Sequence, residues 1–298
     1  MKRKLEISEL IFKILAYFLL TIFALCCLYP FVFAISSAVS GKYYVETNQI
    51  ILLPKDLQFL AFKAVFENNG FWSSYANTLF LTFFGTIFSL VTSILGAYAL
   101  SKKRLLFRRF FNFFLVFTMW FSAGLVPQFL NYVATQKVFR DIGIIDDKWL
   151  IVIAMGMNAM NIILLRNAFE GVPTEIEEAA IVDGATEFQV LSKVYIPMSK
   201  STVATVGLFF GISRWNGYFW AKMMMTRSHN EWPLQVYIRD FFDTYLRDTD
   251  SIRITPNPYA DASIMYAMVV CAIIPILIIY PYIQKYFAKG VTMGGVKE

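Results

Sequence analysis

Long runs of uncharged, apolar residues are the feature that most constrains this chain. No Asp, Glu, Lys or Arg occurs in residues 14–41, 68–101, 110–136, 149–165 or 262–284. An apolar run of about 18 residues is long enough to cross the hydrocarbon core of a bilayer as a helix. A sixth run, residues 201–221, is interrupted only by Arg214. The pattern predicts an all-α membrane protein with six transmembrane helices.

The composition agrees with this class, because 57% of the 298 residues are hydrophobic and the mean hydropathy is +0.54. We expect one membrane domain over residues 1–298. The approximate spans are 12–39, 72–100, 110–133, 149–168, 201–221 and 262–284.

The basic residues indicate the orientation of the helices. The short segment K-K-R-L-L-F-R-R at residues 102–109 carries five positive charges and no negative one, and basic loops are retained in the cytoplasm. Both termini are therefore predicted to be cytoplasmic, in a multi-pass membrane protein. A cytoplasmic loop at residues 170–198 and an extracytoplasmic loop at residues 222–261 follow from this topology. The net charge of +6 requires no nucleic-acid partner.

The predicted cytoplasmic loop contains two helix-start signals. The sequences T-E-I-E and T-E-F-Q, which begin at Thr174 and Thr186, match the capping-box pattern. Gly184 lies between them, where glycine can take the left-handed conformation that ends a helix. The loop is therefore predicted to be a helix, a turn and a second helix that stops at Pro197.

The charge of this loop indicates what it contacts. Residues 170–200 contain six acidic and two basic residues, whereas helices that lie on a membrane surface are rich in Lys and Arg. Phe188, Leu191 and Val194 form an apolar stripe on the second helix. We therefore expect the loop to dock into a groove of a soluble partner.

The same loop carries a longer motif. Glu178, Ala179, Ala180 and Gly184 are followed, after nine residues, by V-Y-I-P at residues 194–197. This resembles the signature E-A-A, three residues, G, nine residues, I-x-L-P of the membrane subunits of bacterial ABC importers, with Val in place of Ile and Ile in place of Leu. The stretches N-I-I-L-L-R-N-A-F-E-G-V-P-T-E-I-E-E-A-A, F-S-A-G-L-V-P-Q-F-L and R-W-N-G-Y-F-W resemble carbohydrate permeases. They are similar to the smaller maltose-type permease and, more closely, to permeases for polysaccharide or lipoprotein uptake.

The resemblance covers nearly the whole chain and implies its partners. They would be a second homologous permease forming a heterodimer, two ATP-binding subunits and an extracytoplasmic solute-binding protein, together with membrane lipid and a carbohydrate substrate. No Walker motif occurs in the sequence, so ATP and Mg would be bound by the partner ATPase and this chain would be no enzyme. It is expected to have no catalytic residue, metal site or cofactor. The residues implied in ATPase coupling are Glu177, Glu178, Ala179, Ala180, Asp183, Gly184 and Ala185.

A sugar path across the membrane must be polar, because unpaired hydroxyl groups are costly in lipid. Polar and aromatic residues inside the predicted spans are therefore candidates for this path, although amides also bond between helices and aromatic residues also anchor span ends. The candidates are Trp120, Gln128, Asn158, Asn161, Arg214, Trp215, Asn216 and Tyr218, with Asn77 as a further one.

Arg214 is the only charged residue within the six runs. A guanidinium can bind a carboxylate through two parallel hydrogen bonds, which would suit an acidic oligosaccharide that contains uronate. The competing interpretation is a salt bridge to the partner permease, or extension of the side chain toward the outer surface.

Two other function classes are consistent with parts of the sequence. A permease for another small solute, such as amino acids or peptides, would share the loop motif. An autonomous secondary carrier would be expected to place carboxylates near the midplane, and none of the six runs contains Asp or Glu. The resemblance favours carbohydrate import over both.

Overall fold

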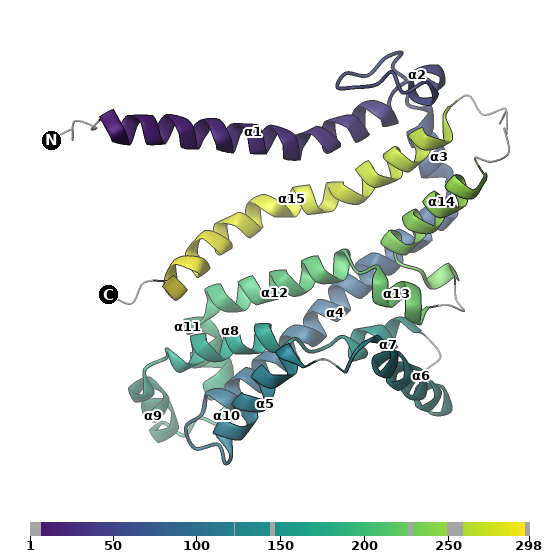
Figure 1. Ribbon diagram of the computed structural model, residues 1–298. Helices are drawn as coiled ribbons and strands as arrows, with labels where there is room; N and C mark the ends of the chain where they lie inside the picture. The colour runs from purple at the N-terminus through teal and green to yellow at the C-terminus, as the bar shows by residue number, and fades with distance from the viewer. Residues whose placement is uncertain (1–6, 122, 144–146, 226–228, 249–258, 296–298) are drawn as a thin grey trace. The chain divides into compact units, whose positions relative to one another are not determined.

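A computed structural model describes residues 7–121, 123–143, 147–225, 229–248 and 259–295 (Figure 1). Every regular element in these residues is a helix. The chain divides into two compact units. Unit 1 comprises Met1–Phe71 and Ile238–Ile274, and unit 2 comprises Trp72–Tyr237 and Pro275–Glu298.

Unit 1 is built around the C-terminal end of a long apolar helix. It contains α1 (Ile7–Ala38), α2 (Lys42–Glu46), α3 (Leu60–Glu67), much of α14 (Leu234–Asp248) and the first part of α15 (Asp261–Gly295). The Ser36 hydroxyl donates to the Leu52 carbonyl at 2.6 Å, and the Ser40 hydroxyl accepts from the Lys55 amide at 3.1 Å. These bonds hold the following loop against the end of α1.

Unit 2 holds most of the remaining helices. After α4 (Asn69–Ser101), most of which belongs to unit 2, they are α5 (Arg108–Trp120), α6 (Leu125–Asp141), α7 (Asp147–Ala154), α8 (Ala159–Glu170), α9 (Thr174–Val182), α10 (Glu187–Val190), the π-helical turn η1 (Leu191–Tyr195), α11 (Ile196–Met198), α12 (Lys200–Trp215), α13 (Phe219–Met224) and the 3-10 turn η2 (His229–Glu231). Its larger core joins α4, α8 and α12 with the residues after α9. The buried members include Ala97, Leu165, Phe169, Val190 and Phe210.

Small residues bring α12 close to α4. Gly207 and Gly211 form a G-x-x-x-G pattern, which allows two helix backbones to approach closely. A Cβ at Gly207 would lie 3.4 Å from Leu90, and one at Gly211 would lie 3.7 Å from the Thr86 hydroxyl. This packing places the C-terminal end of α12 beside the middle of α4.

The segment predicted as the fourth span is two helices with a break. The axes of α7 and α8 differ by 52°. At the break, Gly156 packs so closely on Phe88 that a Cβ would clash with the ring. Asn158 then caps α8, because its side-chain oxygen accepts from the Asn161 amide at 3.1 Å. The break leaves the last carbonyl groups of α7 available to other donors.

The predicted spans correspond only in part to single helices. Within the described residues, three helices are long and apolar enough to cross a membrane: Ile7–Ala38, Asn69–Ser101 and Asp261–Pro281. The number rises to five if α5 with α6, and α7 with α8, each form one broken span. The sixth candidate is shorter than predicted, since α12 has 16 residues and ends at Trp215. Six spans and cytoplasmic termini therefore stay predictions.

The predicted extracytoplasmic loop is partly helical. Its described residues include the second half of α13, together with η2 and α14. Residues 226–228 and 249–258 of this loop, like the last residues 296–298 of the C-terminal tail, lie outside the described part of the chain.

Candidate functional site

The turn after α9 follows from Gly184. Its φ of +82° lies in the left-handed region that favours glycine. The Gly184 amide donates to the Ile181 carbonyl, and the Ala185 amide donates to the Ala180 carbonyl, each at 3.0 Å. This pair of bonds is the Schellman motif, and Ala180 and Ala185 both pack against the core beneath it. The predicted helix stop is therefore confirmed.

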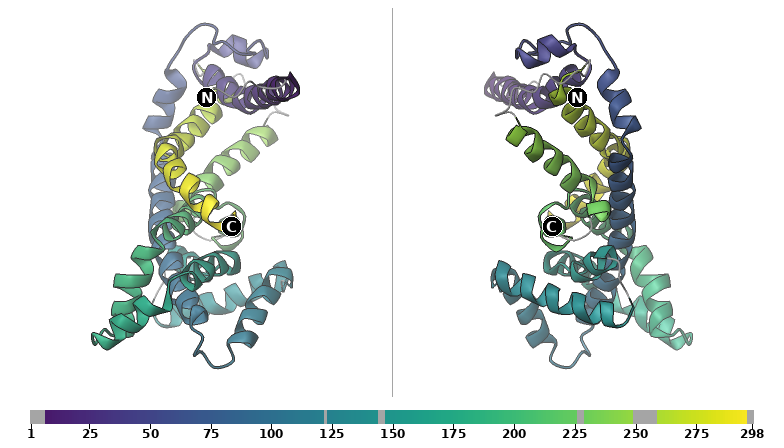
Figure 2. Two further views of the ribbon diagram at one scale, coloured as in Figure 1. Left: turned by 90° about the vertical axis from the view of Figure 1, so that its left-hand side faces the viewer. Right: turned by 90° about the vertical axis from the view of Figure 1, so that its right-hand side faces the viewer.

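The second predicted helix start is also confirmed. The Thr186 hydroxyl accepts from the Gln189 amide at 3.4 Å, and the Gln189 side chain accepts from the Thr186 amide at 2.8 Å. This capping box begins α10. In Figure 1 and Figure 2, α9 and α10 project from unit 2 beside the C-terminal end of α4.

The predicted stop at Pro197 is wrong. The helix continues from α10 through the π-helical turn Leu191–Tyr195 into α11, which contains Pro197, and the break falls at Ser199. Proline lacks the amide that would bond to the carbonyl four residues earlier, and its ring crowds that carbonyl. A wider π turn before the proline accommodates both effects.

The first predicted capping box is also wrong. Thr174 is the first residue of α9, and Pro173 precedes it without a side-chain cap. Glu177 does not turn back to the helix start. Its two oxygens accept instead from Lys102 at 2.6 Å and from the Tyr195 hydroxyl. The Glu177 carboxylate therefore forms an ion pair with Lys102 in place of the predicted hydrogen bond at the start of α9.

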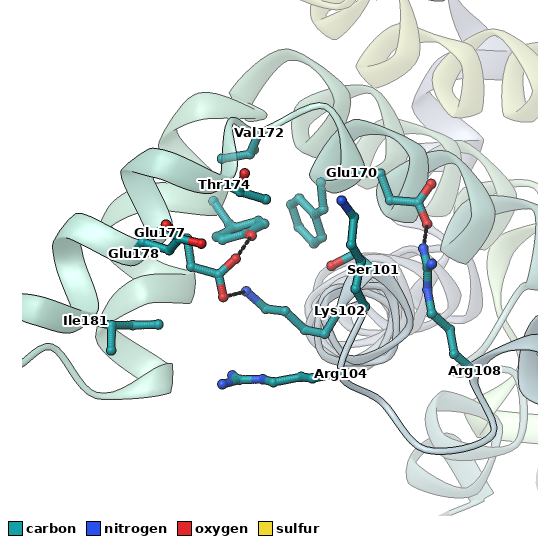
Figure 3. A pocket seen from close by; sticks show the side chains of 13 residues that line it. Ser101, Lys102, Arg104, Arg108, Glu170, Val172, Thr174, Glu177, Glu178 and Ile181 are labelled. Atoms are coloured by element: carbon teal, nitrogen blue, oxygen red, sulfur yellow. Dashed lines mark hydrogen bonds and ion pairs between the residues drawn. The ribbon is translucent and has the colours of Figure 1, made fainter.

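Lys102 lies at the centre of a cluster at the end of α4 (Figure 3). Its side chain is only 9% exposed, and that of Glu177 is 15% exposed. The ammonium lies 4.2 Å from the ring centroid of Tyr98 and 4.1 Å from that of Tyr195. Aromatic faces attract a cation, so the buried charge is stabilised by one carboxylate and two rings.

Two further ion pairs join the basic segment to the acidic one. Glu187 accepts from Arg104 and, at 2.7 Å, from the Tyr98 hydroxyl. Glu170 accepts from Arg108. The basic segment 102–109, which indicates orientation in the sequence, therefore also binds the start of the predicted coupling loop, at Glu170, and its middle, at Glu177 and Glu187. A cavity of about 470 Å³ lies between these segments.

The electrostatics of the cluster keep both carboxyl groups ionised. Burial raises the pKa of Glu177, but the hydrogen bonds from Lys102 and Tyr195 outweigh burial and hold the pKa below its ordinary value. Hydrogen bonds from Tyr98 and Arg104 likewise lower the pKa of Glu187. Burial and the bond to Glu177 raise the pKa of Tyr195, so this hydroxyl remains a donor.

The other predicted coupling residues divide between an outer and an inner side of the loop. Glu178, Ala179, Asp183 and Gly184 are exposed, whereas Ala180 and Ala185 pack partly against the core. Large apolar side chains lie on the exposed side as well. They are Ile176, Ile181, Val182 and Phe188, of which Val182 is 86% exposed. The predicted apolar stripe is split, because Leu191 is buried and Val194 packs inward.

A second cavity, of about 1010 Å³, lies among α6, α7, α8, α12 and α13. Many of its lining side chains are amides, hydroxyls or aromatic rings, which suit a polyhydroxylated ligand with apolar ring faces. Among the predicted path residues, those that line it are Gln128, Asn158, Asn161, Arg214, Asn216 and Tyr218. Asn131, Thr135, Ser213 and Trp220, which the sequence did not single out, also line it.

Arg214 is the only charged residue among the described residues that line this cavity. Its guanidinium donates to the Ser89 hydroxyl at 2.9 Å, to the Ile151 carbonyl at 3.5 Å and to the Met155 carbonyl. These carbonyls belong to the last turn of α7 and the break that follows, where positive charge is favoured by the helix dipole. All three partners are neutral, so they hold the guanidinium in place without cancelling its charge.

Three predicted path residues lie elsewhere. Trp215 is buried, with its ring edge-on to Tyr75 at 5.9 Å between centroids. Trp120 is 81% exposed at the end of α5. Asn77 donates to the carbonyls of Asn230, at 2.8 Å, and Trp232, which ties η2 to α4. None of these three lines the large cavity.

Three long apolar helices with many exposed apolar side chains, and a cavity whose lining includes amides, hydroxyls and aromatic rings, are features of a membrane protein of the transport type. Residues 89–293 match the family described as "Binding-protein-dependent transport system inner membrane component". The match covers more than half of the chain, so the chain belongs to this family of bacterial inner-membrane proteins. The resemblance inferred from the sequence is thereby confirmed.

Individual relatives are similar in sequence to this chain over nearly its whole length. The polygalacturonan/rhamnogalacturonan transport system permease protein YtcP of Bacillus subtilis (strain 168) is 34% identical over 289 residues, which cover 96% of this chain and 98% of YtcP. Protein LplC of the same organism is 31% identical, with 90% and 88% covered.

Solved structures show the same fold. A chain of a bacterial ABC transporter involved in the import of the acidic polysaccharide alginate is 42% identical, with a TM-score of 0.84 and 96% of this chain and 100% of that chain covered. A second alginate transporter chain, crystallised with an alginate pentasaccharide-bound periplasmic protein, is 17% identical with a TM-score of 0.63 and shows the fold alone.

Proposed function

We propose that this chain is the permease subunit of an ATP-driven importer for oligosaccharides that contain uronate. The observation that carries this proposal is the charge of the large cavity. Among its described lining residues Arg214 is the only charged one, and its hydrogen-bond partners are neutral. A cavity with amides, hydroxyls and one uncompensated cation favours a sugar that carries a carboxylate.

The relatives support the same substrate class. YtcP is named for polygalacturonan and rhamnogalacturonan, and the similar solved structure belongs to an importer of alginate, which is described as an acidic polysaccharide. Galacturonate units carry a carboxylate on the ring. Both names therefore point to the chemistry that a fixed guanidinium would recognise.

We propose that Arg214 attracts the substrate carboxylate by its positive potential and does not bind it through two direct hydrogen bonds. The guanidinium holds the end of α7 through backbone carbonyls and contributes its positive potential to the cavity. A carboxylate that enters the cavity is attracted by this potential, while Asn158, Asn161 and Asn216 offer groups for the hydroxyls.

Uptake of matched sugars tests this substrate class. We would compare import of a galacturonate oligomer and a neutral hexose oligomer of equal length, in wild type and in Arg214→Gln, with Ser213→Ala as a neighbouring control in the same cavity. Arg214→Gln is expected to reduce uptake of the acidic oligomer by about tenfold or more, because a unit charge about 8 Å away contributes about 2 kcal/mol at an effective dielectric constant of about 20. Equal loss of both sugars would show that Arg214 does not select charge.

Coupling to ATP hydrolysis is proposed through the exposed side of α9 and α10. Glu178, Ala179 and Val182 offer an acidic and apolar surface outside the described core of unit 2. We propose that this surface docks on one of two ATP-binding subunits, which bind ATP and Mg. A second homologous permease and an extracytoplasmic solute-binding protein would complete the importer.

Co-purification tests the docking surface. Val182→Asp places a charge on a side chain that is 86% exposed, so the fold of the permease should be retained while the ATPase is lost from the eluate. Leu106→Asp is the matched control, since Leu106 is an apolar side chain that is 79% exposed in the segment between α4 and α5. Equal recovery of an ATPase with wild type and Val182→Asp would remove α9 from the interface.

A further inference from the structure

The basic segment after α4, residues 102–109, contacts α9 through one buried lysine, Lys102. We call α9 the coupling helix. Lys102 donates to Glu177 of α9 at 2.6 Å, and its ammonium lies over the rings of both Tyr98 and Tyr195. The two rings also pack edge to face, with centroids 5.1 Å apart. One side chain therefore contacts the end of α4, the middle of α9 and the π-helical turn that leads to α12.

The second oxygen of Glu177 strengthens the same connection. It accepts from the Tyr195 hydroxyl, so both carboxylate oxygens are bound by residues of this chain. The adjacent Glu178 is exposed. Glu177 and Glu178 thus have different tasks: the first faces the permease and the second is free to meet another subunit.

The helices joined by this cluster also form the frame of the large cavity. Ser89 of α4 accepts from Arg214 of α12, and Arg214 lines the cavity. Ser89 precedes Ser101 by twelve residues, which is about 18 Å along a helix. The contacts of Lys102 and Glu177 give a displacement of α9 a direct route to α4 and, through the π-helical turn, toward α12.

We propose that Lys102 is a positioning residue that locks the coupling helix to α4 and α12, so that movement imposed on α9 is passed to the cavity. The inference rests on the proposed function, because it assumes that an ATPase moves α9. It differs from simple stabilisation in one respect: loss of Lys102 should separate ATP hydrolysis from transport while the subunits remain assembled.

The test uses the complete importer reconstituted in lipid vesicles. Lys102→Met removes the charge and retains an unbranched apolar side chain, and Lys103→Met is the control, since Lys103 is the adjacent, exposed lysine. We would measure ATP hydrolysed and sugar imported in the same vesicles. In Lys102→Met the ATP used per sugar should rise about fivefold or more, because the coupling free energy between sites is typically about 1–3 kcal/mol. Lys103→Met should match wild type.

Two further variants keep the test decisive if Lys102→Met is poorly folded. Tyr195→Phe removes only the hydroxyl that binds Glu177 and retains the ring against Lys102, so it should give a smaller rise in ATP used per sugar. Lys102→Arg retains a positive charge for Glu177 and for the two rings, so it should recover coupling relative to Lys102→Met.

The outcomes separate this proposal from the proposed function. An unchanged ratio of ATP hydrolysed to sugar imported in assembled Lys102→Met and Tyr195→Phe importers would overturn the proposed positioning role of Lys102. A loss of transport that follows loss of assembled complex in proportion would also overturn it, because Lys102 would then be merely structural. If wild type itself recruits no ATPase, the proposed function fails first and independently of Lys102.

Discussion

The side chain of Arg214 crosses α4 directly over Gly85. A Cβ at Gly85 would lie 3.0 Å from Nε of Arg214 and 3.1 Å from its Cδ. Glycine at this position therefore gives the guanidinium its route to Ser89 and the end of α7. The arginine depends on the absence of one methyl group on a neighbouring helix.

Gly85→Ala should displace Arg214 and weaken transport of acidic sugar. Gly96→Ala on the same helix is the control, because a Cβ there would meet only Ile162 at 4.0 Å. We expect about tenfold lower uptake of a galacturonate oligomer with Gly85→Ala, comparable to the loss of the Arg214 charge from the cavity, and wild-type uptake with Gly96→Ala. Equal uptake by the two variants would show that the route over Gly85 is unimportant.

Gly184 should tolerate asparagine better than valine. Its φ is +82°, and a β-branched side chain is strained there, whereas asparagine visits this region more readily. Gly184→Val is expected to cost about 1–2 kcal/mol in the turn after α9 and to reduce recovery of a co-purified ATPase. Gly184→Asn should retain most of it. Similar recovery with both variants would mean that the turn conformation does not govern docking.

The capping box at Thr186 should control local opening of α10. Thr186→Ala removes the acceptor of the Gln189 amide and is expected to cost about 1 kcal/mol, so this amide should exchange its hydrogen about fivefold faster. Thr186→Ser retains the oxygen and should restore slow exchange. Equally fast exchange in the serine variant would contradict a capping role.

Acid should weaken the cluster around Lys102 by protonating the carboxylates of Glu177 and Glu187. The folded-state pKa values of Glu177 and Glu187 lie below 4.5, their ordinary value. Their stabilisation is therefore complete above about pH 4.5 and is lost as the pH falls through the lower, folded-state values.

The thermal midpoint of the purified protein measures this loss between about pH 7 and about pH 3.5. Glu177→Gln should be less stable than wild type near neutrality, and the two curves should converge in acid. A difference that stays constant over the whole range would show that ionisation of Glu177 is not what stabilises the cluster.

Sequence patterns predicted the features that depend on neighbouring residues or on the composition of a whole segment. Gly184 ends α9 and Thr186 begins α10 because each acts through backbone groups a few residues away. The membrane class follows from summed hydropathy, and the family follows from motif residues at fixed spacing. These features need no knowledge of which distant residues meet.

Only the tertiary structure decided the partners of the buried charges. Glu177 matches a capping box, yet Lys102 and Tyr195 take its oxygens because a buried ammonium requires a counter-charge more strongly than α9 requires a cap. A basic segment and an acidic loop on the same predicted side were a signal that they attract each other, but not which residues pair. Arg214 is bound by carbonyls exposed at a helix break, and a carbonyl group carries no side-chain signature that a sequence can reveal.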